Sequence, residues 1–305
     1  RDGHAPGVRG DDARRYAEAG ISTDHECVSI DEAHDKLAAG MHILIREGSA
    51  AKNFDVLIPL MDEAPERLMF CTDDAHPDAL LQGHIDALVR RAIAQGYDQM
   101  DVLRAACVHP VHHYSLDVGL LQEGDPADFI VVDALDELNV RRTYIDGTLV
   151  AEEGTTHISR LESPVVNAFA ARPKQPADFA CQARGERIRM IEAEEGQLVT
   201  GEDIMSACVE NGHVISDPSR DVLKLAVVNR YEEAKPAIGF IRGFGLERGA
   251  IASSVAHDAH NIIAVGTSDE ALTQVVNQII AHQGGIGAVD GDEALTLALP
   301  IAGLI

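Results

Sequence analysis

The stretch MFCTDDAHP, residues 69–77, joins an apolar, strand-like segment directly to two adjacent carboxylates, Asp73 and Asp74. Two neighbouring carboxylates repel each other, so such a pair is typical either of a solvated helix start or of a place where a cation sits. Pro77 follows at a position suited to the first turn of a helix. The stretch therefore predicts a strand, a polar strand end and a helix in direct succession.

The same succession recurs between residues 17 and 107. The strands predicted at AGIST, MHILI and RLMFCT end in DHE, REGS and TDD, respectively. Strands that alternate with helices indicate a parallel sheet covered by helices. In a (β/α)8 barrel the carboxyl ends of the strands form the face where chemistry takes place. With three or four such units, residues 1–117 are predicted to form about half of an α/β barrel.

Capping signals and periodicity predict the helices. Ser29 and Glu32 suit a capping box before a helix that ends at Gly40. Another helix is expected between residues 50 and 61, where Pro59 must end or kink it.

A longer helix is expected to begin at Pro77 and to stop at Gly96. Its apolar face is formed by Leu81, Ile85, Leu88, Val89 and Ala92. The segment QMDVLRAACV, residues 99–108, predicts one more helix.

The composition changes after residue 117. Residues 118–160 carry short β runs and turn signals, which predict a small β unit, part of a β-sandwich. The prolines of residues 160–178 are typical of a linker. Residues 161–305 are predicted to form an α+β domain whose clearest helix begins with a capping box of Thr267 and Glu270.

Charge and cysteine usage exclude several classes of partner. The chain has 25 Lys and Arg against 50 Asp and Glu, a net charge of −25, so binding to nucleic acid phosphates is not expected. Apolar runs are shorter than the ~18 residues of a membrane span. Five scattered cysteines without a CxxC pair suit a reducing, cytoplasmic location. The opening RDGHAPG, without Met, predicts that the sequence begins within a longer protein.

Candidate metal ligands follow separate predicted strands. His25 follows one strand and Asp73 another, and His4 would follow a strand cut off by the start of the chain. Imidazoles and a carboxylate suit zinc, iron or manganese. A core or surface histidine is the alternative, and for His4 the spacing alone favours neither.

At these residues the sequence resembles the adenine deaminases of the amidohydrolase superfamily. The motifs are DGHAPG, GISTDHEC, MHILIREGSAAKNF, FCTDDAHPDALLQGHIDALVRRAI, GDPADFIVVD, IGFIRGFGLERGAIASSVAHDAHNIIAVGTSDE and LPIAGL. The resemblance covers nearly the whole chain. It implies the C-terminal half of an amidohydrolase barrel in residues 1–117 and the family's C-terminal domain in residues 161–305.

The resemblance implies a binuclear centre of Mn, Fe or Zn that converts adenine to hypoxanthine and ammonia. His4 and His25 match the histidines after the fifth and sixth barrel strands, and Asp73 matches the aspartate after the eighth. The family's HxH pair and a bridging carboxylate are absent from this sequence and are expected before Arg1. The chain alone is therefore expected to have little or no activity.

The implied reaction uses a metal-activated hydroxide that attacks C6 of adenine. Asp73 is expected to take the proton of this hydroxide and to hand it to the departing ammonia. Glu26 is the candidate acid for the ring nitrogen N1, and a hydrogen bond from Glu26 to a metal ligand is an equal alternative.

Further polar residues are candidates for substrate binding. Asp74 could accept from a purine N–H, or cap the helix that begins near Pro77. Arg46, Glu47 and Ser49 end the neighbouring strand and could line the pocket or form a structural ion pair.

In the last region, His257, Asp258 and His260 could close the active site or bind another ion. The alternative is that they form a hydrogen-bonded turn. The histidines at 109, 112 and 113 are expected at the surface.

For adenine deamination, the expected partner is a purine substrate and the expected assembly is a homo-oligomer. Two other functions are alternatives to adenine deamination. One is hydrolysis of a cyclic amide, as in the dihydropyrimidinases and hydantoinases of the same superfamily. The other is a catalytically silent protein that keeps the fold.

The acidic, Lys-poor composition raises the hypothesis of a halophilic source. Salt screens repulsion between like surface charges, so the melting temperature should rise from low to molar KCl. Thermal unfolding in both buffers tests this hypothesis. If the melting temperature does not rise with KCl, the chain is an ordinary acidic enzyme.

Overall fold

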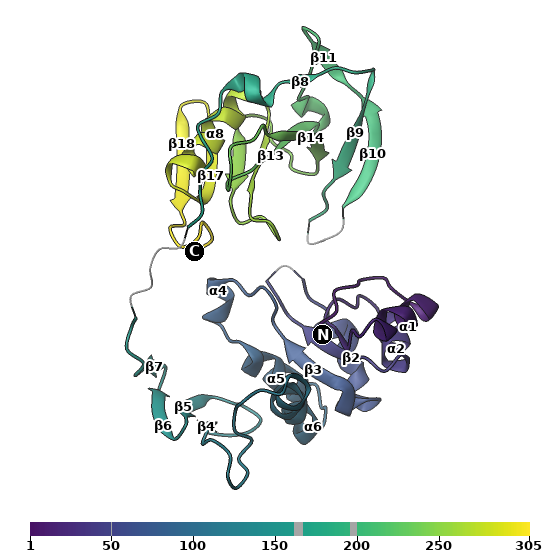
Figure 1. The fold of residues 1–305 in the computed structure, drawn as a ribbon, viewed down its shortest axis with the longest axis vertical. Helices are drawn as coiled ribbons and strands as arrows, with labels where there is room; N and C mark the ends of the chain where they lie inside the picture. The colour runs from purple at the N-terminus through teal and green to yellow at the C-terminus, as the bar shows by residue number, and fades with distance from the viewer. Residues whose placement is uncertain (50, 162–166, 196–199) are drawn as a thin grey trace. The chain divides into compact units, whose positions relative to one another are not determined.

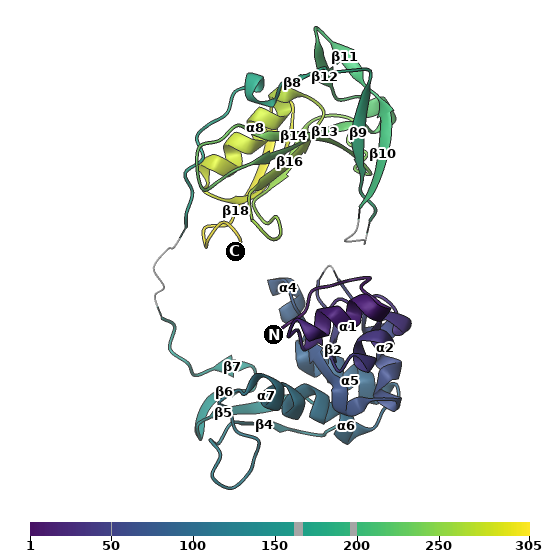
Figure 2. The ribbon, with the colours of Figure 1, turned by 45° about the vertical axis from the view of Figure 1, so that its right-hand side comes forward.

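A computed structural model describes residues 1–49, 51–161, 167–195 and 200–305. The chain divides into two compact units, Arg1–Arg160 and Leu161–Ile305 (Figures 1 and 2). Residues 162–166 of the predicted linker and Ala50 at the start of a predicted helix lie outside the described residues. Within the described ranges, no helix is both long and apolar enough to cross a membrane.

Unit 1 contains three parallel strands. They are β1 (Thr23–Asp24), β2 (His42–Arg46) and β3 (Leu68–Cys71), in the order β1-β2-β3. Strands β2 and β3 lie where they were predicted, whereas β1 overlaps the strand predicted at AGIST only at Thr23. Asp24 lies opposite Ile43, and Arg46 lies opposite Cys71. The carboxyl ends of the strands, with the polar residues that follow them, therefore lie along one edge of the sheet.

The first five residues lie beside β1. The Ser22 N–H donates to the Arg1 carbonyl at 2.9 Å, and the Gly3 N–H donates to Thr23 Oγ1 at 3.2 Å. A Cβ on Gly3 would lie 2.0 Å from the Thr23 carbonyl oxygen, so this close approach requires glycine. The packing places His4 next to the end of β1.

The helices of unit 1 lie only in part against this sheet, with α2 beside β2 and α5 beside β3 (Figure 1), whereas α1 packs on α2. They are α1 (Gly10–Glu18), α2 (Ile30–Ala38), α3 (Phe54–Leu57), α4 (Pro77–Leu80), α5 (Ile85–Ala94), α6 (Gln99–Leu103) and α7 (His109–Tyr114), with 3-10 turns η1 (Ile58–Asp62) and η2 (Pro65–Arg67) and the π-helical turn η3 (Arg104–Val108). Ser29 is the N-cap of α2, because its Oγ accepts from the Glu32 N–H, and Gly40 follows the helix with φ +88° as predicted. The other half of the predicted capping box is not observed, because the Glu32 carboxylate accepts from the Gly7 and Val28 N–H groups instead.

Two helix predictions for unit 1 were wrong in extent. Between residues 51 and 61 the structure has only the single turn of α3, followed by a 3-10 turn that contains Pro59. The helix predicted from Pro77 to Gly96 is two helices, because Gly83 adopts φ +150°, a conformation outside any helix. Leu81, assigned to the apolar face, is 90% exposed at this break.

The core of unit 1 lies between the sheet and its helices. Strand residues Ile43, Ile45 and Leu68 are fully buried and pack with Leu88 and Val89 of α5. The apolar residues of the strands are thus buried in the core, and the polar residues that follow them lie at the sheet edge.

Residues 118–160 contain one antiparallel sheet. Its strands are β4 (Phe129–Val132), β5 (Val140–Ile145), β6 (Thr148–Glu152) and β7 (Thr155–Thr156). The place of this sheet in a β-sandwich, and the boundary at residue 117, stay predictions.

Unit 2 is built on an eight-stranded sheet in the order β10-β9-β14-β13-β16-β15-β17-β18. These strands are β9 (Arg187–Glu192), β10 (Gly201–Ser206), β13 (Leu223–Val228), β14 (Ala237–Arg242), β15 (Ala250–Ser253), β16 (Ile262–Gly266), β17 (Gly285–Asp290) and β18 (Glu293–Ala298). A small sheet joins β8 (Cys181–Gln182), β11 (Cys208–Glu210) and β12 (His213–Ile215), with 3-10 turns η4 (Pro176–Phe179) and η5 (Pro218–Arg220). The apolar face of α8 (Asp269–Ala281) packs on the large sheet.

The capping box predicted for α8 was wrong by one residue. Ser268 is the N-cap, and its Oγ accepts from the Ala271 N–H at 3.1 Å. Thr267 Oγ1 instead donates to the Gly249 carbonyl at 3.0 Å and ties the helix start to the loop before β15.

Replacing the observed cap should destabilise unit 2. Ser268→Ala leaves the Ala271 N–H without its acceptor and should cost about 1 kcal/mol, whereas Ser268→Asp keeps an acceptor and should be close to neutral. Urea unfolding of both variants measures the difference. Equal stability of Ser268→Ala and the parent chain would contradict the assigned cap.

Candidate metal centre

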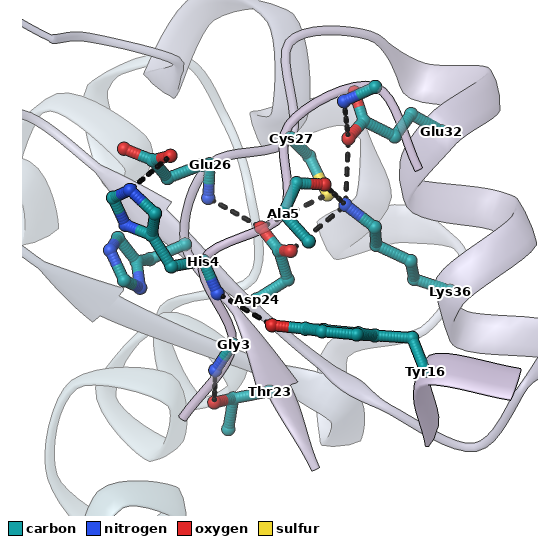
Figure 3. Close-up of polar contacts among 12 residues, drawn as sticks. Gly3, His4, Ala5, Tyr16, Thr23, Asp24, Glu26, Cys27, Glu32 and Lys36 are labelled. Carbon is teal, nitrogen blue, oxygen red and sulfur yellow. Dashed lines mark hydrogen bonds and ion pairs between the residues drawn. The ribbon is translucent and has the colours of Figure 1, made fainter. Parts of the chain in front are cut away.

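Two histidines and a glutamate come together at the edge of the unit 1 sheet. The candidate ligand atoms of His4, His25 and Glu26 lie within 4.8 Å of one another. His4 Nε2 lies 3.3 Å from Glu26 Oε2 (Figure 3), and the two imidazole rings are 5.5 Å apart. The three side chains are therefore close enough to bind one cation together.

Backbone contacts fix the segment that carries His25 and Glu26. The Glu26 N–H donates to Asp24 Oδ1 at 2.6 Å. Asn53 Nδ2 donates to the carbonyls of His25 and Cys27, at 3.2 Å each. The segment after β1 is thus held on both sides, which limits how far the two side chains can move.

Asp73 faces the same cluster from the end of β3. Its Oδ2 lies 3.8 Å from His25 Nε2, and its side chain is 36% exposed. Its backbone is left-handed, with φ +50°, a conformation that aspartate tolerates better than most residues. The turn at Asp73 brings this carboxylate back towards the end of β1.

Arg46 joins the two carboxylates. Its Nη1 donates to Glu26 Oε1 at 2.8 Å and to Asp73 Oδ2 at 2.5 Å. Burial lowers the pKa of Arg46, but the hydrogen bonds to Glu26 and Asp73 raise the pKa above its ordinary value, so the guanidinium stays charged. With neutral imidazoles, two carboxylates and one guanidinium leave one net negative charge, which favours a cation.

The group of close candidate ligands among the described residues contains no cysteine. Burial raises the pKa of Cys71, at the end of β3, to about 12.

Two of the predicted substrate-binding residues line a cavity of about 460 Å³ at the ends of β2 and β3. Glu47 and Ser49 form part of its wall together with Thr72 and His84. Glu47 Oε1 also lies 3.3 Å from Arg91 Nη1, so the ion pair that was the alternative for this region is present.

The structure assigns Asp74 a backbone contact. Its carbonyl accepts from the Ser49 N–H at 3.1 Å. The N-cap position of α4 is His76, whose N–H donates to Ser49 Oγ at 2.8 Å, so Asp74 is not the N-cap residue. The role of Asp74 in substrate binding stays a prediction.

His257, Asp258 and His260 belong to unit 2, in the loop between β15 and β16. The rings of His257 and His260 are 5.0 Å apart, and the His260 N–H donates to the Ala256 carbonyl at 2.6 Å. The hydrogen-bonded turn is thus present, and a contribution of these residues to the centre in unit 1 stays a prediction.

Two of the three histidines expected at the surface are partly buried. His109 Nδ1 lies 2.9 Å from the Leu68 carbonyl oxygen, and the ring of His113 packs on His42 at 4.7 Å. Burial lowers the pKa of His113, and it lowers that of His42 to about 4. These histidines therefore serve packing, and only His112 is exposed as predicted.

The sequence interpretation missed a buried ion cluster directly behind the centre. Lys36 Nζ lies 2.9 Å from Asp24 Oδ2 and 2.7 Å from Glu32 Oε1. The available signal was the spacing of Glu32 and Lys36, four residues apart on one helix, in a chain with few lysines.

Comparison with known proteins identifies the families that the chain resembles. The amidohydrolase family profile matches residues 2–150, and the profile of the adenine deaminase C-terminal domain matches residues 197–305. The first match defines unit 1 as an amidohydrolase domain with α/β content.

Relatives extend the match to the whole chain. Adenine deaminases of Salinibacter ruber, Sulfurovum sp. and Methanosarcina barkeri are 65%, 53% and 49% identical to it. Each alignment covers 100% of this chain but only 56–57% of the relative, so the chain spans little more than half of their length. With both profiles and these relatives in agreement, the chain belongs to the adenine deaminase family.

One solved structure is a distant neighbour. The beta-aspartyl dipeptidase of Fervidobacterium islandicum is 15% identical, covers 46% of this chain and 42% of its own, and has a TM-score of 0.38. This likeness is too distant to support an argument.

The grouped side chains should bind a divalent metal measurably in the 305-residue chain. His25→Ala removes a nitrogen ligand and should weaken Co²⁺ binding at least about 10-fold, because loss of an outer-shell partner alone costs 10–100-fold. Equilibrium dialysis with Co²⁺ measures the affinity. His112→Ala, which removes an exposed histidine, is the control and should bind as the parent does. Equal affinity of both variants would place the metal elsewhere.

Proposed function

We propose that this chain supplies part of the active site of an enzyme that hydrolyses adenine to hypoxanthine and ammonia. The observation that carries the proposal is the convergence of His4, His25, Glu26 and Asp73 at one sheet edge. The relatives that match the whole chain support the choice of adenine. In this proposal, β1–β3 and the segment beside β1 form part of a (β/α)8 barrel.

The donor set fits a divalent metal. Two imidazoles and the carboxylates of Glu26 and Asp73 suit Mn, Fe or Zn, and we propose that they hold their share of a binuclear centre. A metal bound here would lower the pKa of a water molecule towards neutrality. The net negative charge of the cluster supports this assignment.

Asp73 is the proposed proton carrier. Its carboxylate is partly exposed and is held by Arg46 on one side, with His25 on the other. It takes a proton from the attacking water and delivers it to the 6-amino group as the carbon–nitrogen bond breaks. Arg46 keeps the carboxylate in place during both transfers.

Glu26 has two proposed uses. Its Oε2 faces His4 Nε2 and its Oε1 accepts from Arg46, which supports a role in metal binding or ligand orientation. The second use, donation of a proton to N1 of the ring, requires a protonated carboxyl group.

The substrate pocket is proposed at the adjoining cavity. Its volume of about 460 Å³ falls within the ~300–1,000 Å³ range of small-molecule sites, and Glu47 and Ser49 offer polar contacts. Arg46 does not line this cavity, and its Nε is buried without an acceptor among the described residues. The purine specificity, the homo-oligomer and the cytoplasmic location stay predictions.

Adenine turnover tests the proposal directly. The 305-residue chain and a chimera that adds the remaining part of the Salinibacter ruber relative are loaded with Mn²⁺, Fe²⁺ or Zn²⁺ and assayed for ammonia release. The chimera should hydrolyse adenine in preference to dihydropyrimidines and hydantoins. Faster hydrolysis of a cyclic amide would contradict the proposed function and favour a cyclic-amide hydrolase. Absence of turnover with every substrate would favour a non-catalytic protein.

Glu26→Gln in the chimera separates the two uses of Glu26. Glutamine keeps the size of the side chain but supplies neither a carboxylate ligand nor an acid, so turnover should fall about 100-fold or more, within the range for loss of an acid–base group. Near-normal turnover would remove Glu26 from the acid role. Unchanged Co²⁺ affinity together with low turnover would favour the acid over the ligand.

A further inference from the structure

Lys36 is one of the largest fully buried side chains in the part of the chain that the structure describes, and its ammonium has three hydrogen-bond acceptors. Its Nζ donates to the Ala5 carbonyl at 2.7 Å, to Asp24 Oδ2 at 2.9 Å and to Glu32 Oε1 at 2.7 Å (Figure 3). An ammonium has three N–H donors, so each donor has one acceptor.

The three acceptors belong to the segments that carry the candidate ligands. Ala5 follows His4 directly, and Asp24 precedes His25 directly. The second oxygen of Asp24 accepts from the Glu26 N–H at 2.6 Å. One ammonium therefore joins the backbone beside His4 to the backbone that carries His25 and Glu26.

Glu32 strengthens the same link from the side of helix α2. Its Oε1 also accepts from the Gly7 N–H at 2.7 Å, and its Oε2 accepts from the Val28 N–H at 3.0 Å. Gly7 lies three residues after His4, and Val28 lies two residues after Glu26. The Lys36–Glu32 pair thus holds both ligand-bearing segments against one helix.

Stability alone is a weak reason for this arrangement. Burying an ammonium and two carboxylates costs desolvation free energy that their attraction often fails to exceed, so an apolar replacement can be neutral or stabilising. Burial lowers the pKa of Lys36, but the hydrogen bonds to Glu32 and Asp24 raise the pKa above its ordinary value, and the group remains charged. Retention of a buried charge is better explained by what it positions.

We propose that Lys36 is a positioning residue of the metal centre, which sets the separation between the His4 imidazole and the His25–Glu26 pair without touching the metal. The inference rests on the proposed metal centre, not on the identity of the substrate. Loss of the ammonium leaves the Ala5 carbonyl and Asp24 without their shared donor, so the two segments can move apart.

Lys224 offers a matched control within the same chain. It is 2% exposed, its Nζ donates to the Phe179 carbonyl at 3.0 Å, and it pairs with Asp269. This pair lies in unit 2 and holds the start of α8, far in sequence from the candidate ligands of unit 1. Lys224→Met therefore removes a buried ammonium of the same kind without loosening the centre.

The experiment compares Co²⁺ binding by the 305-residue chain, Lys36→Met and Lys224→Met. Circular dichroism first establishes that each variant is folded at the assay temperature. Lys36→Met should bind Co²⁺ about 10–100-fold more weakly, and the visible absorption of the bound Co²⁺ should change, because its ligands are held less closely. Lys224→Met should match the parent in affinity and spectrum.

A folded Lys36→Met with parental affinity and spectrum would overturn the proposal, as would equal losses in both methionine variants. If Lys36→Met does not fold, Glu32→Gln takes its place, because it keeps the side-chain volume while it weakens the hold on Gly7 and Val28. Parental Co²⁺ binding by a folded Glu32→Gln would then overturn the proposal.

The outcome is distinct from that of the adenine assay. Lys36-dependent Co²⁺ binding without adenine turnover in the chimera would support the positioning role and reject the substrate. Absence of Co²⁺ binding by the parent chain would overturn the positioning role, whatever the chimera hydrolyses.

Discussion

The arrangement of unit 1 depends on a buried ammonium that has three acceptors from three separate segments. Parallel strands bring their ends to one edge, but pairing alone does not fix the side chains that follow those ends. Lys36 supplies the missing constraint, since it bonds beside His4 and beside His25 at once. A lysine suits this task because its three donors diverge, whereas a planar guanidinium would present its donors in one plane.

Arg46 applies the complementary constraint at the open side of the centre. Glu26 and Asp73 carry like charges, and without a cation between them their carboxylates would separate. Arg46 donates to both, and its planar group reaches from the end of β2 to the ends of β1 and β3. One cation behind the ligands and one beside them thus hold an acidic cluster that would otherwise repel itself, and the cluster keeps the negative charge that a metal requires.

The sequence predicted the parts of this design that are local. Strand ends in DHE and TDD, and a cap at Ser29, depend on neighbouring residues, and the structure confirms these elements. Lys36 was not predictable in the same way, since a lysine on a helix ordinarily faces solvent and its burial depends on Ala5 and Asp24. The break at Gly83 was hidden for a similar reason, because apolar spacing continues through it.

The order of the extended segments bears on the kind of sheet to which they belong. The segment of Gly3 lies beside β1, β1 beside β2, and β2 beside β3, so each segment neighbours the one that precedes it in the chain. A doubly wound sheet reverses its order at a switch point and binds its ligand in the crevice there. Unit 1 shows no such reversal among its described strands. Its polar residues are instead spread over successive strand ends, which a (β/α)8 barrel would bring together at its mouth. Because these side chains come from different strands, cations such as Lys36 and Arg46 are what holds the acidic groups close to one another.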